Sequence, residues 1–85
     1  MQVHVPTPLR SYTHASVVNA EGGTLAELLK DLDRQYPGMR FRIVNEQDRI
    51  REHIRFFVNQ EIANGLAAPL HPGDDVHIIM AISGG

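Results

Sequence analysis

The chain has 85 residues, of which 42% are hydrophobic and 21% are charged, with a formal net charge of −2 and no cysteine. This length suits one small domain, and the charge excludes the overall basic field that would hold nucleic acid or an anionic membrane. The lack of thiols excludes a disulfide scaffold, a cysteine nucleophile and thiolate metal sites, and we expect a reduced, cytoplasmic setting.

Two short strands are predicted at the start of the chain. Residues 2–5 alternate in polarity with Val3 and Val5 facing inward, and the prolines that follow end the strand because proline donates no ladder hydrogen bond. Residues 15–20 form the second strand. The two strands can pair as a hairpin, although the connection at 9–14 is too long for a tight turn.

A helix is the clearest element of the sequence. Thr24 and Glu27 have the capping-box spacing, in which the Thr24 hydroxyl accepts from the amide of residue 27 and the Glu27 carboxylate accepts from the amide of Thr24. An apolar stripe follows at helical spacing, formed by Leu25, Leu28, Leu29 and Leu32. Tyr36 continues this stripe. The Pro-Gly pair at 37–38 ends the helix, because the residue before proline avoids the helical region.

Residues 39–53 mix four arginines and three acids with a few apolar side chains. The acids offset the arginines, so the segment predicts a solvated, ion-paired loop with a short strand or turn rather than a phosphate-binding surface. If the loop has a function, a protein partner is the use that we favour.

Strands account for most of the remaining chain. One is predicted at 54–59, a brief one at Ile62, and a final strand at 76–82 after the turn at 72–74. Alternation and spacing place one set of apolar side chains inward: Ile54, Phe56, Val58, Leu66, Leu70, Val76, Ile78, Met80 and Ile82. The order of elements is typical of an α+β fold in which one helix covers one face of a mixed sheet.

Three apolar side chains alternate with this inward set. Phe57, Ile79 and Ala81 therefore point to the sheet face that the helix leaves uncovered. Apolar residues grouped on such a face form a docking patch for a partner. Scattered exposed apolar residues are equally normal on any protein surface, so the sequence leaves both interpretations open.

No pattern in the sequence predicts a metal site or a catalytic residue. The histidines lack the close spacing of a metal-binding pair on a helix, although His4 and His77 occupy outward positions on strands that are candidate neighbours. These two histidines are candidates for a weak metal site, but ordinary surface histidines are the favoured interpretation. Asp74 and Asp75 are interpreted as solvated turn residues, with Asp74 closing the Pro-Gly turn.

The end of the chain carries the most specific signal. It contains FVN at 57–59, LHPGDDVHII at 70–79 and SGG at 83–85, after a helix start that reads GTLAELL at 23–29. With these motifs nearly the whole chain resembles the MoaD/ThiS family of ubiquitin-like sulfur carriers. The resemblance implies a β-grasp domain over 1–82, with a mixed sheet of four to five strands packed on one helix, and a flexible tail at 83–85.

The resemblance also implies a function. An E1-like activating enzyme (an adenylyltransferase) uses ATP to adenylate the carboxylate of Gly85, and sulfur then displaces AMP to leave a thiocarboxylate. Ser83 and Gly84 thread a narrow channel in the partner, because glycine has no side chain to obstruct it. Phe57 and Ile79, with Ala81, are the predicted docking residues.

A sulfur-accepting biosynthetic enzyme is the second implied partner. Its product is cysteine, molybdopterin, thiamin or a related metabolite, and the helix start and the FVN strand favour the cysteine type. The carrier itself is not an enzyme, binds no permanent cofactor or metal, and has no nucleic-acid or membrane partner. Two alternatives share the fold: a ubiquitin-like modifier conjugated to proteins through Gly85, and a non-catalytic β-grasp interaction domain.

Overall fold

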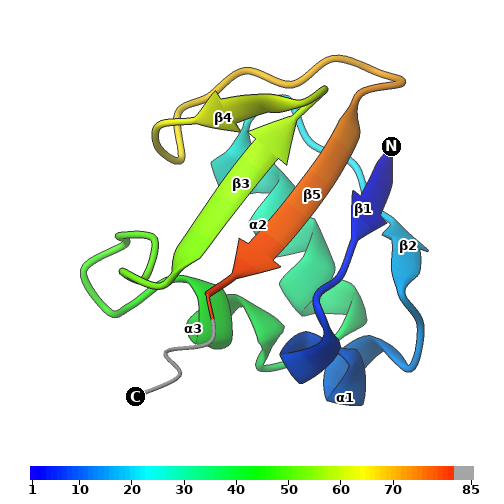
Figure 1. The fold of residues 1–85 in the computed structure, drawn as a ribbon, viewed down its shortest axis with the longest axis vertical. Helices are drawn as coiled ribbons and strands as arrows, with labels where there is room; N and C mark the ends of the chain where they lie inside the picture. The colour runs from blue at the N-terminus through cyan, green and yellow to red at the C-terminus, as the bar shows by residue number, and fades with distance from the viewer. Residues whose placement is uncertain (82–85) are drawn as a thin grey trace.

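A five-stranded mixed sheet forms the frame of the computed structural model, which describes residues 1–81 (Figure 1). The strand order is β2-β1-β5-β3-β4, for β1 (Gln2–His4), β2 (Val17–Asn19), β3 (Ile54–Val58), β4 (Glu61–Ala63) and β5 (Asp75–Met80). β1 and β5 run parallel, and the other neighbouring pairs are antiparallel. With one long helix packed across the sheet, this is the predicted α+β arrangement of a β-grasp domain.

The long helix, α2 (Leu25–Gln35), supplies one side of the core. All four leucines of the predicted stripe are 0% exposed, and they face inward side chains of the sheet such as Phe56 and Val76. Burying one leucine contributes about 1.5–3 kcal/mol. The stripe therefore contributes as much free energy as the whole net stability of a typical small domain, about 5–15 kcal/mol.

The start of α2 is capped partly as predicted. The Thr24 hydroxyl accepts from the amide of Glu27 at 3.3 Å, but the Glu27 carboxylate accepts from the amide of Gly23 at 2.8 Å rather than from that of Thr24. An extended loop runs past this end of the helix, where Leu25 and Ala26 donate their amides to carbonyls of that loop. The loop thus satisfies helix-start donors that would otherwise need water or side chains.

The carbonyls that accept these two amides belong to Ala68 and Leu66. Leu70 is buried at the end of the same loop, and Leu66 packs against the core. The prediction that both leucines pack under this loop is therefore confirmed.

The prediction of a loop at 39–53 is wrong for its first third, which forms the short helix α3 (Met39–Ile43). Met39 and Ile43 are both 0% exposed, so burial at i and i+4 stabilises a turn of helix too short to show periodicity in the sequence. The Asp33 carboxylate accepts from the amides of Gly38 and Arg40 and so satisfies donors at the start of α3.

The rest of that segment agrees with the prediction. An isolated bridge joins Val44 to Ile50, and Arg40 pairs with Asp48 at 2.8 Å. The segment is therefore an ion-paired turn that closes on itself beside α3.

The connection between the first two strands also contains helical turns that the sequence did not predict. They are a 3₁₀ turn at Thr7–Leu9 and the short helix α1 (Arg10–Thr13), held in place by the buried side chain of Leu9. The two strands pair antiparallel, as predicted, but are shorter than predicted. No helix within residues 1–81 is long and apolar enough to cross a bilayer.

The close approach of Gly22 to α2 generates a stability prediction. A Cβ at Gly22 would lie 2.5 Å from the backbone nitrogen of Leu28, so Gly22→Ala must displace backbone. We expect it to lower the free energy of unfolding by about 1–3 kcal/mol. A Cβ at Gly65 meets nothing within 4 Å, and Gly65→Ala is the matched control. Urea denaturation of both variants measures the difference, and equal stability of the two would contradict this account.

Candidate functional site

The sheet face opposite α2, hereafter the open face, looks towards the viewer in Figure 1. Cross-strand register aligns one row of its side chains across all five strands: Val17, His4, His77, Phe57 and Ile62. Several apolar side chains of this face are exposed, including Ile62 at 51% and Ile79 at 46%. Such a concentration of exposed apolar side chains favours contact with another molecule.

The predicted docking residues lie on this face. Phe57 is half-buried within the row, and Ile79 faces Arg55 across the β3–β5 ladder. Ala81 is exposed, and its amide donates to the carbonyl of His53, which extends the pairing beyond β5. The predicted orientation of Phe57 and Ile79 is confirmed, and their role in docking stays a prediction.

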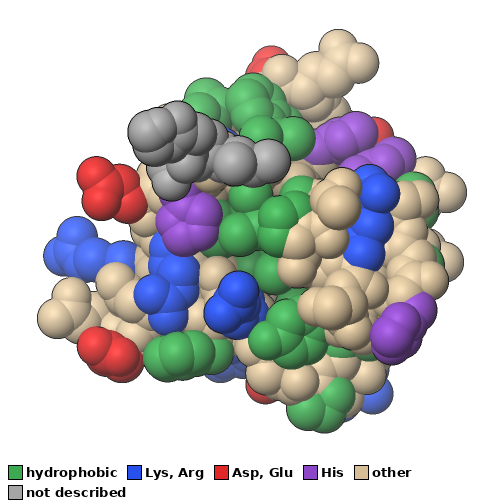
Figure 2. All heavy atoms as spheres, turned by 60° about the horizontal axis from the view of Figure 1, so that its bottom comes forward, with side chains coloured by type: hydrophobic (Ala, Val, Ile, Leu, Met, Phe, Trp, Pro, Cys, Tyr) green, Lys and Arg blue, Asp and Glu red, His purple; other side chains and the backbone are tan. Residues whose placement is uncertain are grey.

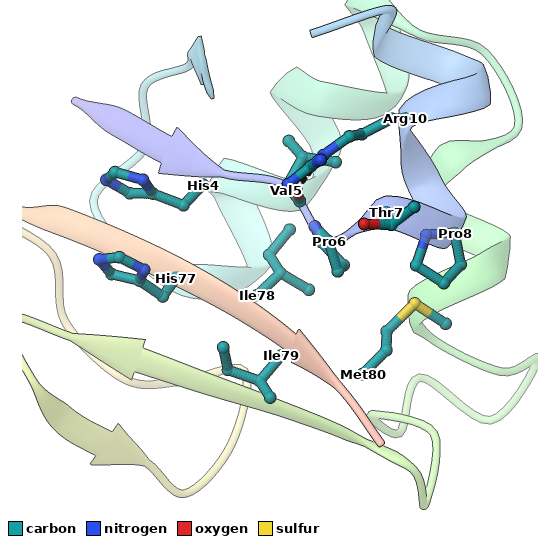
Figure 3. Close-up of a pocket in the computed structure, with 10 residues that line it drawn as sticks. All are labelled: His4, Val5, Pro6, Thr7, Pro8, Arg10, His77, Ile78, Ile79 and Met80. Atoms are coloured by element: carbon teal, nitrogen blue, oxygen red, sulfur yellow. Dashed lines mark hydrogen bonds between the residues drawn. The ribbon is translucent and has the colours of Figure 1, made fainter. Parts of the chain in front are cut away.

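A groove of about 380 Å³ runs beside the last residues of β5 (Figure 3). Its walls are largely apolar and come from Pro6 and Pro8 on one side and from Ile79 and Met80 on the other. From the sequence, the two prolines are predicted only to end the first strand. The groove depends on the parallel pairing of β1 with β5, which local sequence patterns do not reveal.

A basic and aromatic cluster borders the same end of β5. Phe41, Arg42, Arg51 and His53 surround a second hollow together with Met80. Arg51 donates to the carbonyl of Phe41 at 2.8 and 3.0 Å, and its guanidinium lies 4.9 Å from the centre of the Phe41 ring. Figure 2 shows basic and hydrophobic side chains gathered on this end of the molecule.

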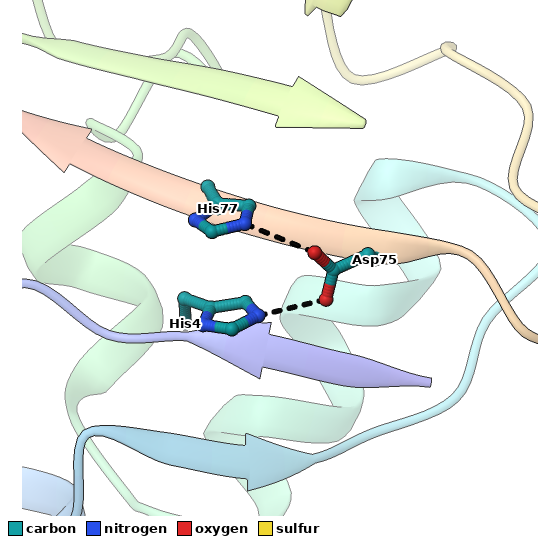
Figure 4. A group of neighbouring side chains, drawn as sticks. All are labelled: His4, Asp75 and His77. Atoms are coloured by element: carbon teal, nitrogen blue, oxygen red, sulfur yellow. Dashed lines mark hydrogen bonds and ion pairs between the residues drawn. The ribbon is translucent and has the colours of Figure 1, made fainter. Parts of the chain in front are cut away.

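Two histidines that also line the groove meet one carboxylate on the open face (Figure 4). The rings of His4 and His77 stack with centroids 3.8 Å apart, and both Nε2 atoms point to Asp75, at 2.7 Å and 3.0 Å. Hydrogen bonding from His4 is the main cause that holds the pKa of Asp75 below its ordinary value of 3.8. Asp75 begins β5, so its prediction as a turn residue is wrong.

The turn before β5 is fixed by Asn59 and Asp74. Asn59, in the left-handed region at φ 50°, donates its side-chain amide to the Asp74 carboxylate at 2.9 Å and accepts from the amide of Asp75 at 2.9 Å. The other Asp74 oxygen accepts from the amide of His71 at 2.8 Å. Asp74 therefore closes the turn, as predicted.

The predicted tail residues Ser83, Gly84 and Gly85 lie outside the described residues, and so does Ile82. The described part of the chain ends at Ala81, next to Met80, which lines both the groove and the hollow of the basic cluster. Both surfaces therefore border the point from which the predicted tail continues.

Fold and topology define a β-grasp domain of the ubiquitin-like class. The sequence model of the ThiS family matches residues 3–85. The sulfur carrier protein CysO of Mycobacterium tuberculosis is 33% identical over an alignment of 89 positions, gaps included, which covers 98% of this chain and 96% of the relative. The chain therefore belongs to the ThiS family.

Solved structures agree with this assignment. A chain of the Amycolatopsis orientalis BexX/CysO complex matches with a TM-score of 0.91 and 33% identity, covering 99% of this chain and 98% of that chain. Mycobacterium tuberculosis CysO, described as an antigen, matches with a TM-score of 0.89 and 31% identity over 95% of this chain and 98% of its own. SAMP1 of Haloferax volcanii shares the fold at 23% identity, with a TM-score of 0.83 and coverage of 100% and 98%.

The Asp74 turn generates a prediction on acid stability. Hydrogen bonding from the amide of His71, and then from Asn59, holds the pKa of Asp74 below its ordinary value of 3.8. A carboxylate whose pKa is lower in the folded than in the unfolded state stabilises the fold at pH values above its unfolded-state pKa. This contribution is lost as the pH falls through the folded-state pKa. We therefore expect Asp74→Asn to be less stable than the parent at neutral pH and to approach it in acid.

Urea denaturation at pH steps between about 7 and 2 measures this difference. Glu46→Gln, which removes an exposed carboxylate from the turn after α3, is the control. A stability gap for Asp74→Asn that stays constant down to the lowest pH would contradict the assigned role.

Proposed function

We propose that this chain is a sulfur carrier protein, whose terminal carboxylate at Gly85 is adenylated and then converted to a thiocarboxylate. The observation that carries the proposal is the family match, which extends over residues 3–85 and so includes the Gly-Gly pair. The relative with 33% identity across nearly the same length is named a sulfur carrier protein. The carrier then donates this sulfur to an enzyme that makes a sulfur-containing metabolite.

Activation is needed because of the charge on a carboxylate. A terminal carboxyl has a pKa of about 3.3–3.7, so at neutral pH it is an anion that resists nucleophilic attack. A carboxylate oxygen attacks the α-phosphorus of ATP and expels pyrophosphate, which leaves an acyl adenylate. A sulfur nucleophile then attacks the acyl carbon and expels AMP. With sulfide as the nucleophile, the product is a thiocarboxylate and one proton is released.

All of this chemistry occurs at the terminal carboxyl group, so the carrier is a co-substrate of the activating enzyme and not an enzyme itself. We infer that ATP binds to the partner and that the reaction takes place in the cytoplasm, the setting that the sequence leads us to expect. The folded domain contributes recognition: the open face and the groove beside β5 carry exposed hydrophobic side chains close to the last described residues of the chain. A partner that binds these surfaces therefore orients the tail at 83–85 towards its own active site.

The modifier alternative has weaker support. The structures described as small archaeal modifier proteins are 20–23% identical to this chain, and similarity at that level shows the fold alone. A plain interaction domain would give no reason for the family match to extend through the Gly-Gly pair.

Intact-mass measurement tests the proposed chemistry. The protein is incubated with ATP, sulfide and an E1-like activating enzyme of the same organism. We expect a mass gain equal to the replacement of one oxygen by sulfur, localised to Gly85 by fragmentation. Omission of ATP should abolish the gain, because the carboxylate is then not activated.

Two variants sharpen this test. Deletion of Gly85, and extension of the chain by one alanine, should each abolish the gain while the melting temperature stays unchanged. An extended chain that still gains sulfur at the same site would overturn the proposal, because activation requires a free terminal carboxyl at Gly85.

The docking surface generates a separate prediction. Ile79 is 46% exposed on the open face and Phe57 is half-buried, so Ile79→Asp is the cleaner probe. We expect Ile79→Asp to weaken binding to the activating enzyme by about 1–2 kcal/mol, because it places a charge in a hydrophobic contact. Ala67→Asp adds the same charge on an exposed loop and should leave binding unchanged. Calorimetric titration measures the affinity of both variants for the activating enzyme. Equal affinities of the two variants would show that this part of the face does not contact the enzyme.

A further inference from the structure

Three side chains capable of binding a metal converge on the open face, although two of them lie 71 residues apart in the sequence. His4 lies opposite His77 in the parallel ladder between β1 and β5, and Asp75 precedes His77 by two positions on the same face of β5. Their potential ligand atoms all lie within 4.8 Å of one another. We propose that His4, His77 and Asp75 form a binding site for a divalent transition-metal ion of the Zn²⁺ type.

The donor set decides the kind of ion. Two imidazole nitrogens and one carboxylate oxygen suit Zn²⁺, whereas Ca²⁺ and Mg²⁺ prefer sites made of oxygen. Three protein ligands leave at least one coordination position of a tetrahedral ion for water or another ligand. The three side chains are 33–44% exposed, so an ion can reach them directly from solvent.

The present distances need only a small change. The carboxylate oxygens lie 2.7 Å and 3.0 Å from the two Nε2 atoms, which are hydrogen-bond distances. Two ligands that each lie 2.0–2.1 Å from a tetrahedral ion are about 3.3 Å apart. The groups must therefore separate by a few tenths of an ångström, and the two stacked rings must tilt so that both nitrogens face one ion.

Proton positions also permit binding. An ionised carboxylate only accepts hydrogen bonds, so in the hydrogen-bonded state each Nε2 atom carries a proton and donates a hydrogen bond to Asp75. To bind an ion, each neutral ring moves that proton to Nδ1, by exchange with water, and presents the lone pair of Nε2. The ion replaces the two hydrogen bonds that hold the cluster together.

The backbone around the cluster is held on both sides. Asp75 donates its amide to the side chain of Asn59 and accepts from the amide of Asn59, each at 2.9 Å. His77 lies in the strand that pairs with both β1 and β3. Ligands that are placed on strands and fixed by such contacts meet the requirement that a metal site be organised before the ion arrives.

This site is independent of the terminal carboxylate, so it goes beyond the proposed function. It also departs from the sequence-based interpretation of both histidines as ordinary surface residues. That interpretation lacked the third ligand, because Asp75 was assigned to the turn.

The test is calorimetric titration of the untagged, metal-free full chain with Zn²⁺. We expect one bound ion per chain. Loss of a residue that only supports a metal ligand costs about 10–100-fold in affinity, so His4→Gln, His77→Gln and Asp75→Asn should each weaken Zn²⁺ binding at least tenfold. His14→Gln and His71→Gln, at exposed histidines outside the cluster, should leave the affinity unchanged.

A second readout locates the ion. In proton NMR spectra, Zn²⁺ should shift the ring resonances of His4 and His77 and leave those of the other three histidines in place. Absence of one-to-one binding, or binding that survives all three substitutions, would overturn the proposal. Thermal unfolding of each variant without metal shows whether it is folded. If a histidine variant is not folded, Asp75→Asn still tests the site, because it preserves the shape of the side chain. The titration uses the free chain without ATP or the activating enzyme, so its outcome does not depend on the proposed carrier function.

Discussion

The parallel pairing of β1 with β5 is the constraint on which the rest of the molecule depends. It places the last described strand in the middle of the sheet, between β1 and β3. A parallel pair cannot be closed by a tight turn, so the chain between its strands must cross the sheet, and α2 makes that crossing. The buried leucines of α2 hold the crossing in place. The core and the groove beside β5 both require this pairing, and so does the meeting of His4 with His77.

The two sides of β5 present different side chains. Val76 and Ile78 are buried beneath α2, whereas His77 and Ile79 look out from the open face. A strand with alternating side chains can therefore anchor the domain and recognise a partner along the same few residues. Under the proposed function, Ile79 precedes the reacting carboxylate of Gly85 by six residues in the sequence.

Much of this could be predicted because its signals are local. The leucine stripe has a helical period, and the alternation in β3 and β5 has a period of two, so Phe56 was assigned to the core and Phe57 to the opposite face. The helix α3 was missed because five residues are too few to show a period, and tertiary burial of Met39 stabilises it. The groove was missed, and His4 and His77 were noted as candidate neighbours without Asp75, because both features depend on the β1–β5 register, which joins residues far apart in the chain.

The central position of β5 has a mechanical consequence. Five residues of β5 pair with β3, and its first three residues pair with β1. A pull on the chain beyond Met80 acts along the strand, so it loads these hydrogen bonds together in shear instead of opening them one after another. An edge strand such as β4 has a single hydrogen-bonded neighbour and would peel away at a lower force. The central strand therefore resists unravelling when force is applied to the chain beyond Met80.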